Sequence, residues 1–302
     1  MAWSHYRSMG RSNHTDSYYR IFKKQHAWAK KKRLSLDALS HVSTLEANLF
    51  APLHPTTRAE YEAADGKELK SKLFSVMSSA ALVCNVFDYW RSKGRAATIA
   101  KCCAIPDSVT QLSFEPAFEI FEGKKPARPD AALIDGPSLR DAQVLTAVEA
   151  KFAEPYRRSN FPDREPFSET YFKPASSSIW LGLTETKKLA ETIRLRWKST
   201  PLCPLFEYLD VPQLIKDAIG LNLASRKGKR FTLLYLWFEV RIGAVPTADS
   251  AQLRNEIDLF RKATAGEFTF RDLTYQSLFG KIQDVGQEHM AYTRYLADRY
   301  FD

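Results

Sequence analysis

Residues 231–240, FTLLYLWFEV, form a nearly continuous apolar run that is rich in aromatic side chains. A run of this length without polar alternation is typical of a strand buried on both faces. Residues 144–152, VLTAVEAKF, are a second strongly apolar strand, interrupted by Glu149 and Lys151. Strands of this kind need covering layers on both sides, so we predict a single α/β domain with a central mixed sheet.

Two shorter segments supply further strands. Residues 111–120 are β-prone, although Pro116 weakens or bulges that strand. Residues 129–135 begin with a proline and lead into a turn at 135–138. The connection from this turn to the strand at 144–152 has the length of a hairpin, so the two strands are expected to be neighbours.

Apolar residues at helical spacing predict helices over 67–91 and 180–198. Three more helices are expected to close the chain, the first capped by Asp249 or Ser250, the second by Asp272. The predicted order is therefore helix, three strands, helix, strand, with added helices at both ends.

The chain has 302 residues and a formal net charge of +9 at pH 7. We expect a basic N-terminal extension over 1–60 that packs on or flanks a single domain over 61–302. A basic excess attracts polyanions, and nucleic acid is the commonest of these. The run Lys30–Arg33 is then either an arm that contacts DNA or a solvated helix face.

The cysteine and hydropathy patterns exclude several classes. Four cysteines without a C-x-x-C pair are too few for a disulfide scaffold and fit reduced thiols in a cytoplasmic protein. No stretch approaches the roughly 20 apolar residues that span a membrane. The first residues lack the apolar core of an export signal, so no membrane partner is expected.

An acid followed two residues later by lysine occurs five times, and context separates the five. Two of the pairs lie in helical patterns, where residues two apart do not share a face, and two lie in a turn or at a strand end. The pairs are Asp65–Lys67, Glu68–Lys70, Glu122–Lys124, Glu149–Lys151 and Glu185–Lys187. Only Glu149 and Lys151 interrupt an apolar strand, and such a conflict with local patterning tends to mark a functional site.

Asp130 lies one strand earlier and completes the candidate set. Pro-Asp occurs at Pro106, Pro129 and Pro162, and only Asp130 after Pro129 is on the preceding strand. Side chains two apart on a strand point the same way, so Glu149 and Lys151 should face one site while Ala150 faces away. Two carboxylates on neighbouring strands can share a Mg²⁺ ion, and an adjacent lysine can position water or stabilise phosphate charge. This is the chemistry of phosphodiester hydrolysis.

The segments R-P-D-A-A-L-I-D (128–135) and A-V-E-A-K-F-A-E-P-Y (147–156) resemble the PD-(D/E)xK, restriction-endonuclease-like superfamily. More narrowly, they are similar to a bacterial family of restriction endonucleases whose third core strand ends in E-x-K-F-x-E-P-Y. Residues 78–85, 274–279 and 299–300 resemble further segments of that family. Ala80 departs from the pattern, because a glutamine is expected there.

The resemblance implies the superfamily core of helix, three strands, helix, strand, and Mg²⁺-dependent cleavage of DNA, with Mn²⁺ as a possible substitute ion. Asp130 and Glu149 would bind the ion, and Lys151 would assist the attacking water. Because the first core strand carries several acids, the third ligand is open among Glu115, Glu119 and Glu122, and we favour Glu115. Glu154 would orient a ligand or Lys151.

The leading hypothesis is therefore a Mg²⁺-dependent endonuclease acting on double-stranded DNA. The alternative is a catalytically silent nucleic-acid-binding or assembly protein that retains the fold. The intact Asp, Glu and Lys set argues against silence, because decay usually removes one member. A weaker reading takes the Glu-Ala-Lys triplet as coincidental in a protein that is not a nuclease. Restriction enzymes often act as dimers, so a homodimer is one form that the resemblance suggests.

Overall fold

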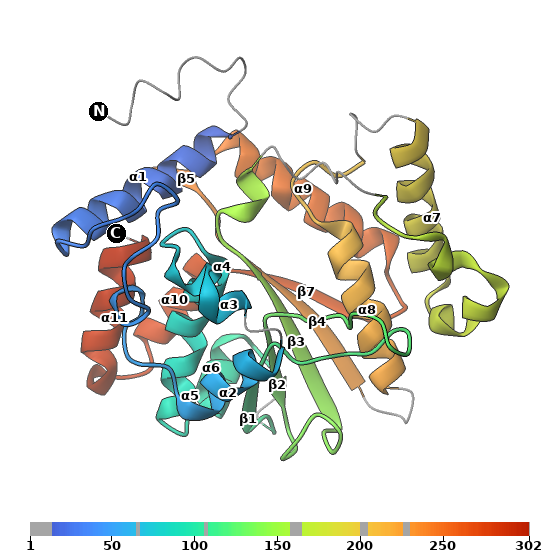
Figure 1. Ribbon diagram of the computed structural model, residues 1–302, viewed down its shortest axis with the longest axis horizontal. Helices are drawn as coiled ribbons and strands as arrows, with labels where there is room; N and C mark the ends of the chain where they lie inside the picture. The colour runs from blue at the N-terminus through green and yellow to red at the C-terminus, as the bar shows by residue number, and fades with distance from the viewer. Residues whose placement is uncertain are drawn as a thin grey trace.

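The computed structural model describes residues 14–64, 67–105, 108–157, 165–199, 205–225 and 230–301. A five-stranded sheet runs through its centre, with helices on both sides (Figure 1). In their order across the sheet the strands are β1 (Gln111–Phe114), β2 (Ala131–Ile134), β3 (Val144–Lys151), β4 (Arg230–Trp237) and β7 (Thr269–Thr274). β1 to β3 pair antiparallel, whereas β4 runs parallel to both β3 and β7. The predicted mixed α/β fold is thereby confirmed.

Helices precede, separate and follow the strands of the sheet along the chain. The longer helices are α1 (Asp16–Lys31), α2 (Pro55–Ala64), α7 (Thr184–Ser199), α8 (Val211–Ser225), α9 (Ala248–Ala263) and α10 (Tyr275–Gln283). The shorter ones are α3 (Lys67–Lys70), α4 (Ser79–Val83), α5 (Tyr89–Ser92), α6 (Ala96–Cys102) and α11 (Met290–Leu296). Within the described ranges, no helix is both long and apolar enough to cross a membrane.

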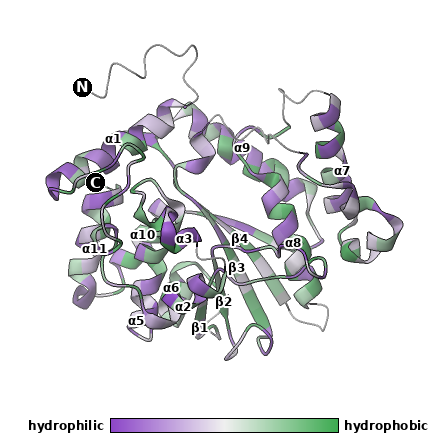
Figure 2. Ribbon diagram, viewed as in Figure 1, coloured by the Kyte–Doolittle hydropathy of each residue, from purple (hydrophilic) through white to green (hydrophobic). Residues whose placement is uncertain are grey.

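Hydrophobic residues run along the strands at the centre of the sheet (Figure 2). β2 is buried along its whole length, and Leu233–Trp237 of β4 are buried as well. One face of the edge strand β7 packs on α9, where the Phe260 and Phe270 rings meet edge to face. On the other face Arg271 donates to the carbonyl of Ala104 at the end of α6. Burial on both faces is what the apolar runs predicted.

The predicted helix over 67–91 is wrong in its first half. α3 ends at Lys70, a short 3-10 helix covers Lys72–Phe74, and α-helix resumes only at α4, continuing through a π-helical turn over Cys84–Asp88 into α5. Between them, the backbone N–H of Val42 donates to Phe74, and that of Val76 donates to Ser40. The chain around Ser75 therefore pairs with residues 40–42, and this long-range pairing outweighs the local helical spacing.

Two elements near the end of the chain differ from expectation. Residues 269–274 form strand β7, where no strand was predicted, and α8 is an additional helix before β4. The predicted caps are wrong too, because Thr247 caps α9 and Thr274 caps α10 through their side-chain oxygens. Strand β7, TFRDLT, has only two apolar residues in six positions and no regular alternation, which is a weak signal.

α1 is tied to the end of the chain by a buried arginine. Arg299 is fully buried, and its guanidinium lies 4.1 Å from the centroid of the Trp28 ring. It donates to Gln25 Oε1 at 3.2 Å and to the carbonyl oxygen of Asn48 at 2.6 Å. One side chain thus joins α1, the segment before α2 and the C-terminal π-helical turn Ala297–Phe301.

We predict that Arg299→Ala lowers the free energy of unfolding by about 3 kcal/mol or more, because several buried acceptors lose a charged donor worth roughly 1–3 kcal/mol each. Urea denaturation followed by circular dichroism measures the change. Arg294→Ala is the matched control, since Arg294 is exposed on α11 and its loss should stay within about 0.5 kcal/mol. Equal effects of the two substitutions would contradict the anchoring role.

Candidate active site

Three acids of the predicted site lie in one row across three strands. Ala131 of β2 pairs with Val148 of β3, so Asp130, just before β2, lies beside Glu149. The backbone N–H of Glu115, just after β1, donates to the carbonyl oxygen of Asp130 at 3.1 Å. Residues that pair directly across strands present their side chains to the same face. The sheet register thus brings these acids together from segments far apart in the sequence.

Two hydrogen bonds define the centre of this row. The Lys151 ammonium donates to Glu149 Oε1 at 2.5 Å, and the two side chains are 19% and 5% exposed. Asp130 Oδ2 accepts the backbone N–H of Ala150 at 2.7 Å. The contact between Glu149 and Lys151 shows that both side chains lie on one face, as their spacing predicted. Ala150 has no exposed surface and packs in the core.

The pKa values of these groups reflect their burial and the charges of their close neighbours. Burial raises the pKa of Asp130 well above its usual range, the charge of Glu149 raises it further, and Lys151 acts in the opposite direction. Burial also raises the pKa of Glu149, although the Lys151 ammonium lowers it in part. Burial alone would lower the pKa of Lys151, but Glu149 and Asp130 outweigh it and hold the lysine charged. The site therefore holds one positively charged side chain, Lys151, beside the crowded carboxyl groups of Asp130 and Glu149.

Glu115 is the best placed of the three acids considered as a third ligand. Its backbone has a φ of +47°, and Arg128 donates to its carbonyl oxygen at 2.8 Å. Burial raises the pKa of its carboxyl from 4.5 to about 7, with Glu68 adding to the shift. Glu119 and Glu122 are exposed in the following loop. Glu115 is therefore the acid of this group that shares the environment of Asp130.

The donor set at the row suits a hard divalent cation through two carboxylates. Among the described residues, no group of three His, Cys, Asp or Glu side chains is arranged to hold a metal ion. Mg²⁺ in proteins is commonly bound by one or two carboxylates, with water filling the other positions. Asp130 and Glu149 are adjacent in register, and burial among other acids raises the pKa values of both carboxyl groups. These two side chains could supply the carboxylates of such a site.

The other motif matches lie away from the row or outside the described residues. Glu185 is on α7, and Glu122 is in an exposed loop. Asp65 and the Pro-Asp pairs at Pro106 and Pro162 lie outside the described residues. Glu68 is on α3, as its spacing predicted, and the Lys72 ammonium donates to its Oε1 at 2.5 Å. It still lies within electrostatic reach of Glu115, so the helix that carries it borders the site.

Sequence reasoning missed a fully buried acid, Asp217 of α8. Its pKa is raised well above the usual range, first by burial and then by Glu149, while Lys151 lowers it. Tyr235, the register partner of Glu149 on β4, is also buried. A charged residue within the apolar helix VPQLIKDAIGLNLAS was the available signal, because it breaks the pattern as Glu149 does in β3.

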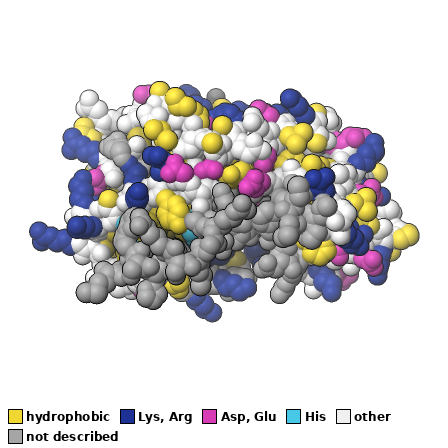
Figure 3. Space-filling view, turned by 90° about the horizontal axis from the view of Figure 1, so that it is seen from above, with side chains coloured by type: hydrophobic (Ala, Val, Ile, Leu, Met, Phe, Trp, Pro, Cys, Tyr) yellow, Lys and Arg dark blue, Asp and Glu magenta, His cyan; other side chains and the backbone are white. Residues whose placement is uncertain are grey.

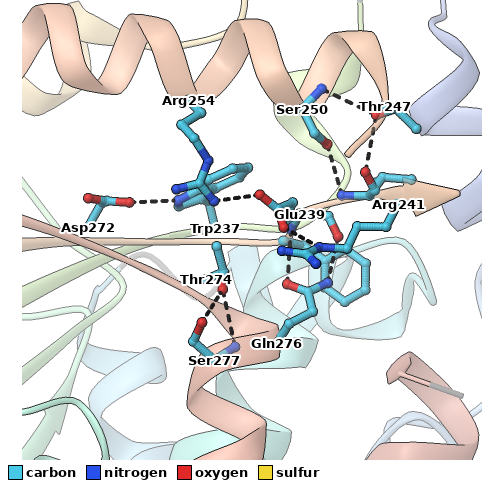
Figure 4. Close-up of polar contacts among 12 residues, drawn as sticks. Trp237, Glu239, Arg241, Thr247, Ser250, Arg254, Asp272, Thr274, Gln276 and Ser277 are labelled. Carbon is cyan, nitrogen blue, oxygen red and sulfur yellow. Dashed lines mark hydrogen bonds and ion pairs between the residues drawn. The ribbon is translucent and has the colours of Figure 1, made fainter. Parts of the chain in front are cut away.

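A second polar cluster fixes the end of β4 beside the site. Glu239 is buried and forms ion pairs with Arg241 and with Arg254 of α9, and the Arg254 guanidinium lies 5.2 Å from the Trp237 ring (Figure 4). Gln276 of α10 donates to the carbonyl oxygen of Glu239 at 2.6 Å and accepts its N–H at 3.1 Å. Since Trp237 is paired in register with Lys151, these contacts hold the strand that neighbours the lysine.

Glu154 has a clear structural task. Its Oε1 accepts the backbone N–H of Ser79 at the start of α4, at 3.0 Å, and its Oε2 accepts that of Phe152 at 2.9 Å. The carboxylate thus joins the first turn of α4 to the end of β3. Its charge adds to the rise in the pKa of Glu149. Glu154 therefore acts on the site through the position of β3 and through its field.

The raised pKa of Glu115 predicts a pH dependence of stability in the metal-free protein. Between about pH 4.5 and 7 the folded chain keeps a proton that the unfolded chain has released, so stability falls as pH rises through that window. Glu115→Gln should reduce this fall by on the order of 2 kcal/mol. The measurement is urea denaturation in EDTA at both ends of the window. An unchanged pH profile would show that Glu115 is not in the crowded environment described here.

Comparison with known proteins gives one match. The family model for restriction endonucleases associating with ARP matches residues 12–301, which is nearly the whole chain. No curated protein and no solved structure matches the chain. The family match spans the strands that carry Asp130, Glu149 and Lys151 as well as α1 and the C-terminal helices. The chain therefore belongs to the family of restriction endonucleases associating with ARP.

Proposed function

We propose that the protein is a Mg²⁺-dependent endonuclease that hydrolyses DNA phosphodiester bonds. The observation that carries the proposal is the contact between Lys151 and Glu149 in register with Asp130, within a buried strand. Membership of a restriction endonuclease family supports DNA as the substrate. Structural needs alone do not explain why an apolar strand should bury a lysine and a glutamate side by side.

We also propose that the sheet is the restriction-endonuclease-like core. Helices α4, α5 and α6 precede three antiparallel strands, α7 and α8 follow them, and β4 then runs parallel to β3. This is the order helix, three strands, helix, strand. In such an arrangement the end of the third strand, where Lys151 lies, borders the substrate.

Asp130 and Glu149 would hold the ion, with Glu115 as a further acid beside them. When bound, Mg²⁺ would neutralise charge on the scissile phosphate and favour the ionised form of the attacking water. The protein's own contribution is to place these carboxylates at fixed positions, because β3 is paired with a strand on each side. Asp130 is further held by the N–H of Ala150, which leaves its other oxygen for the ion.

Lys151 would act on the substrate rather than on the ion. Its ammonium is held charged by Glu149 and Asp130, which raise its pKa. A positioned cation stabilises negative charge that develops on the phosphate and can orient the water that attacks it. Since Lys151 is the last residue of β3 and keeps 19% of its side chain exposed, it can reach a phosphate from the strand's open end.

DNA contacts would come mainly from basic side chains outside the site. Exposed lysine and arginine residues lie along α1 and just after it, among them Lys23, Lys30 and Arg33. Figure 3 shows Lys and Arg side chains at the edge of the molecule on which α1 ends. The core-facing side of α1 is buried through Ile21 and Trp28, so this surface is attached firmly to the domain.

Substitutions in the site separate cleavage from binding. Glu149→Gln and Asp130→Asn should each lower Mg²⁺-dependent plasmid cleavage by at least about 100-fold, because the ion loses a charged ligand. Lys151→Met should have a similar effect on the rate while leaving metal binding intact. All three should still bind duplex DNA in gel-shift assays, since phosphate contacts lie elsewhere. Cleavage by Glu149→Gln at the wild-type rate would refute the mechanism. Wild type that binds DNA well and never cuts it would favour the silent binder.

Salt dependence tests the basic surface. Changing Lys23, Lys30 and Arg33 together to glutamine should make the plot of log binding constant against log salt shallower, by about 0.9 for each phosphate that the variant no longer neutralises. Point substitutions are required, because deleting α1 would remove Gln25 and Trp28 from the buried anchor at Arg299. Thermal unfolding checks that the variant keeps its fold. An unchanged slope would assign these residues to a solvated surface.

A further inference from the structure

Two buried polar groups near the site have no hydrogen-bond partner within the described chain. Oδ2 of Asp217 is one, and the hydroxyl of Tyr235 is the other. Asp217 has no exposed surface and Tyr235 has 1%. An unpaired buried polar group costs about 1–3 kcal/mol, so such groups in a native fold call for an explanation. Both come from elements that pack together, because α8 lies against β4.

These groups lie beside the Lys151–Glu149 contact. Tyr235 is paired in register with Glu149, so the two side chains point to the same face of the sheet. Asp217 is within electrostatic reach of both Glu149 and Lys151. Its other oxygen, Oδ1, accepts from Gln213 Nε2 at 3.1 Å, which leaves Oδ2 available. Lys151 is thus bound to Glu149, while two unpaired polar atoms lie on the neighbouring elements, one on Tyr235 of β4 and one on Asp217 of α8.

The two tasks proposed for this site compete for one carboxylate. Glu149 Oε1 accepts the Lys151 ammonium, and Glu149 is also the proposed metal ligand. A carboxylate committed to a divalent cation is a weaker partner for an ammonium, because the two cations repel each other at short range. A lysine that leaves Glu149 without another acceptor would be a buried, unpaired charge, which is strongly destabilising.

We propose that Asp217 and Tyr235 form a second binding position for the Lys151 ammonium, which it occupies when Glu149 binds metal. The inference rests on the proposed function and deepens it by assigning positioning residues to the lysine. In the structure the ammonium is bound to Glu149. On metal binding it turns to Asp217 Oδ2 and the Tyr235 oxygen, where it stays charged and directed along the face on which the phosphate lies.

The test is Mn²⁺ binding by the full chain without DNA, measured by isothermal titration calorimetry. Asp217→Asn keeps the shape and removes the carboxyl that would accept the ammonium, so Mn²⁺ affinity should fall on the order of tenfold or more, as it does when residues that orient a metal ligand are replaced. Tyr235→Phe should cause a smaller fall. Asp272→Asn is the matched control. Asp272 of β7 pairs in register with Tyr235, but its carboxylate is already bound to Trp237 and Arg261. This substitution should leave the Mn²⁺ affinity unchanged.

A double substitution distinguishes this role from direct action on the ion. Lys151→Met should bind Mn²⁺ at least as tightly as wild type, and adding Asp217→Asn to it should have no further effect. If Asp217→Asn weakens binding equally without Lys151, Asp217 acts on the ion and the proposal is overturned. An unchanged affinity in both Asp217→Asn and Tyr235→Phe overturns it as well.

Stability and activity provide the remaining controls. Asp217→Asn should not lower the melting temperature of the protein in EDTA, because it replaces a buried carboxyl of which one oxygen has no partner and keeps an oxygen for Gln213. If that variant fails to fold, Tyr235→Phe and its double variant with Lys151→Met give the same comparison. Wild type that binds Mn²⁺ and cuts DNA, with no effect of either substitution, contradicts this inference alone. Wild type that neither binds Mn²⁺ nor cuts DNA contradicts the proposed function and, with it, the second lysine position.

Discussion

The contact between Lys151 and Glu149 is the interaction around which the rest of the site is arranged. Both residues belong to a strand that is paired on both sides, so their backbone positions are fixed within the sheet. Withdrawing two charges from water costs several kcal/mol per ion, and only close partners offset that cost. The fold therefore has to supply those partners at fixed positions. It does so through strand register, which sets Asp130 beside Glu149 and Tyr235 on its other side.

The segments that resemble the family outside the site explain how those strands are held. Glu154 joins the end of β3 to the first turn of α4. Gln276 of α10 clamps both backbone groups of Glu239 just after β4. Asn85 donates to the Tyr300 hydroxyl, which ties the π-helical turn after α4 to the end of the chain. These contacts are buried or partly buried, and those of Glu154 and Gln276 constrain the ends of the two parallel strands.

The sequence was most informative where the spacing of the apolar residues in a segment agreed with the burial of that segment in the fold. The strands over 129–135, 144–152 and 231–240 were predicted because continuous apolar runs have few other uses in an α/β domain. Glu149 and Lys151 stood out for the opposite reason, since charge inside such a run is costly and needs a purpose. The same logic applied to helices would have found Asp217, which interrupts the apolar α8.

What the sequence could not show depends on pairing between distant segments. The predicted helix over 67–91 is broken because residues near Ser75 pair with residues near His41, and nothing local announces that pairing. β7 is a strand because β4 offers it an unpaired edge, and its own six residues carry only a weak pattern. The position at which β1 ends against β2 decides which acid lies near Asp130. It places Glu115 there, and not Glu119 or Glu122. Register, which decides the geometry of the site, is a property of strand pairs.

The excess of acid over base at the site is a cost to the fold, and on the proposed function it would favour the binding of a cation. Glu115, Asp130, Glu149 and Asp217 each have a raised pKa, and Lys151 is the lysine at their centre. A core built for stability alone would replace such a group with apolar residues, which often makes a protein more stable. If the site binds Mg²⁺ as proposed, the ion would relieve the repulsion between these acids, and its binding would stabilise the folded state. The long apolar strands on either side provide the stability that makes this tolerable.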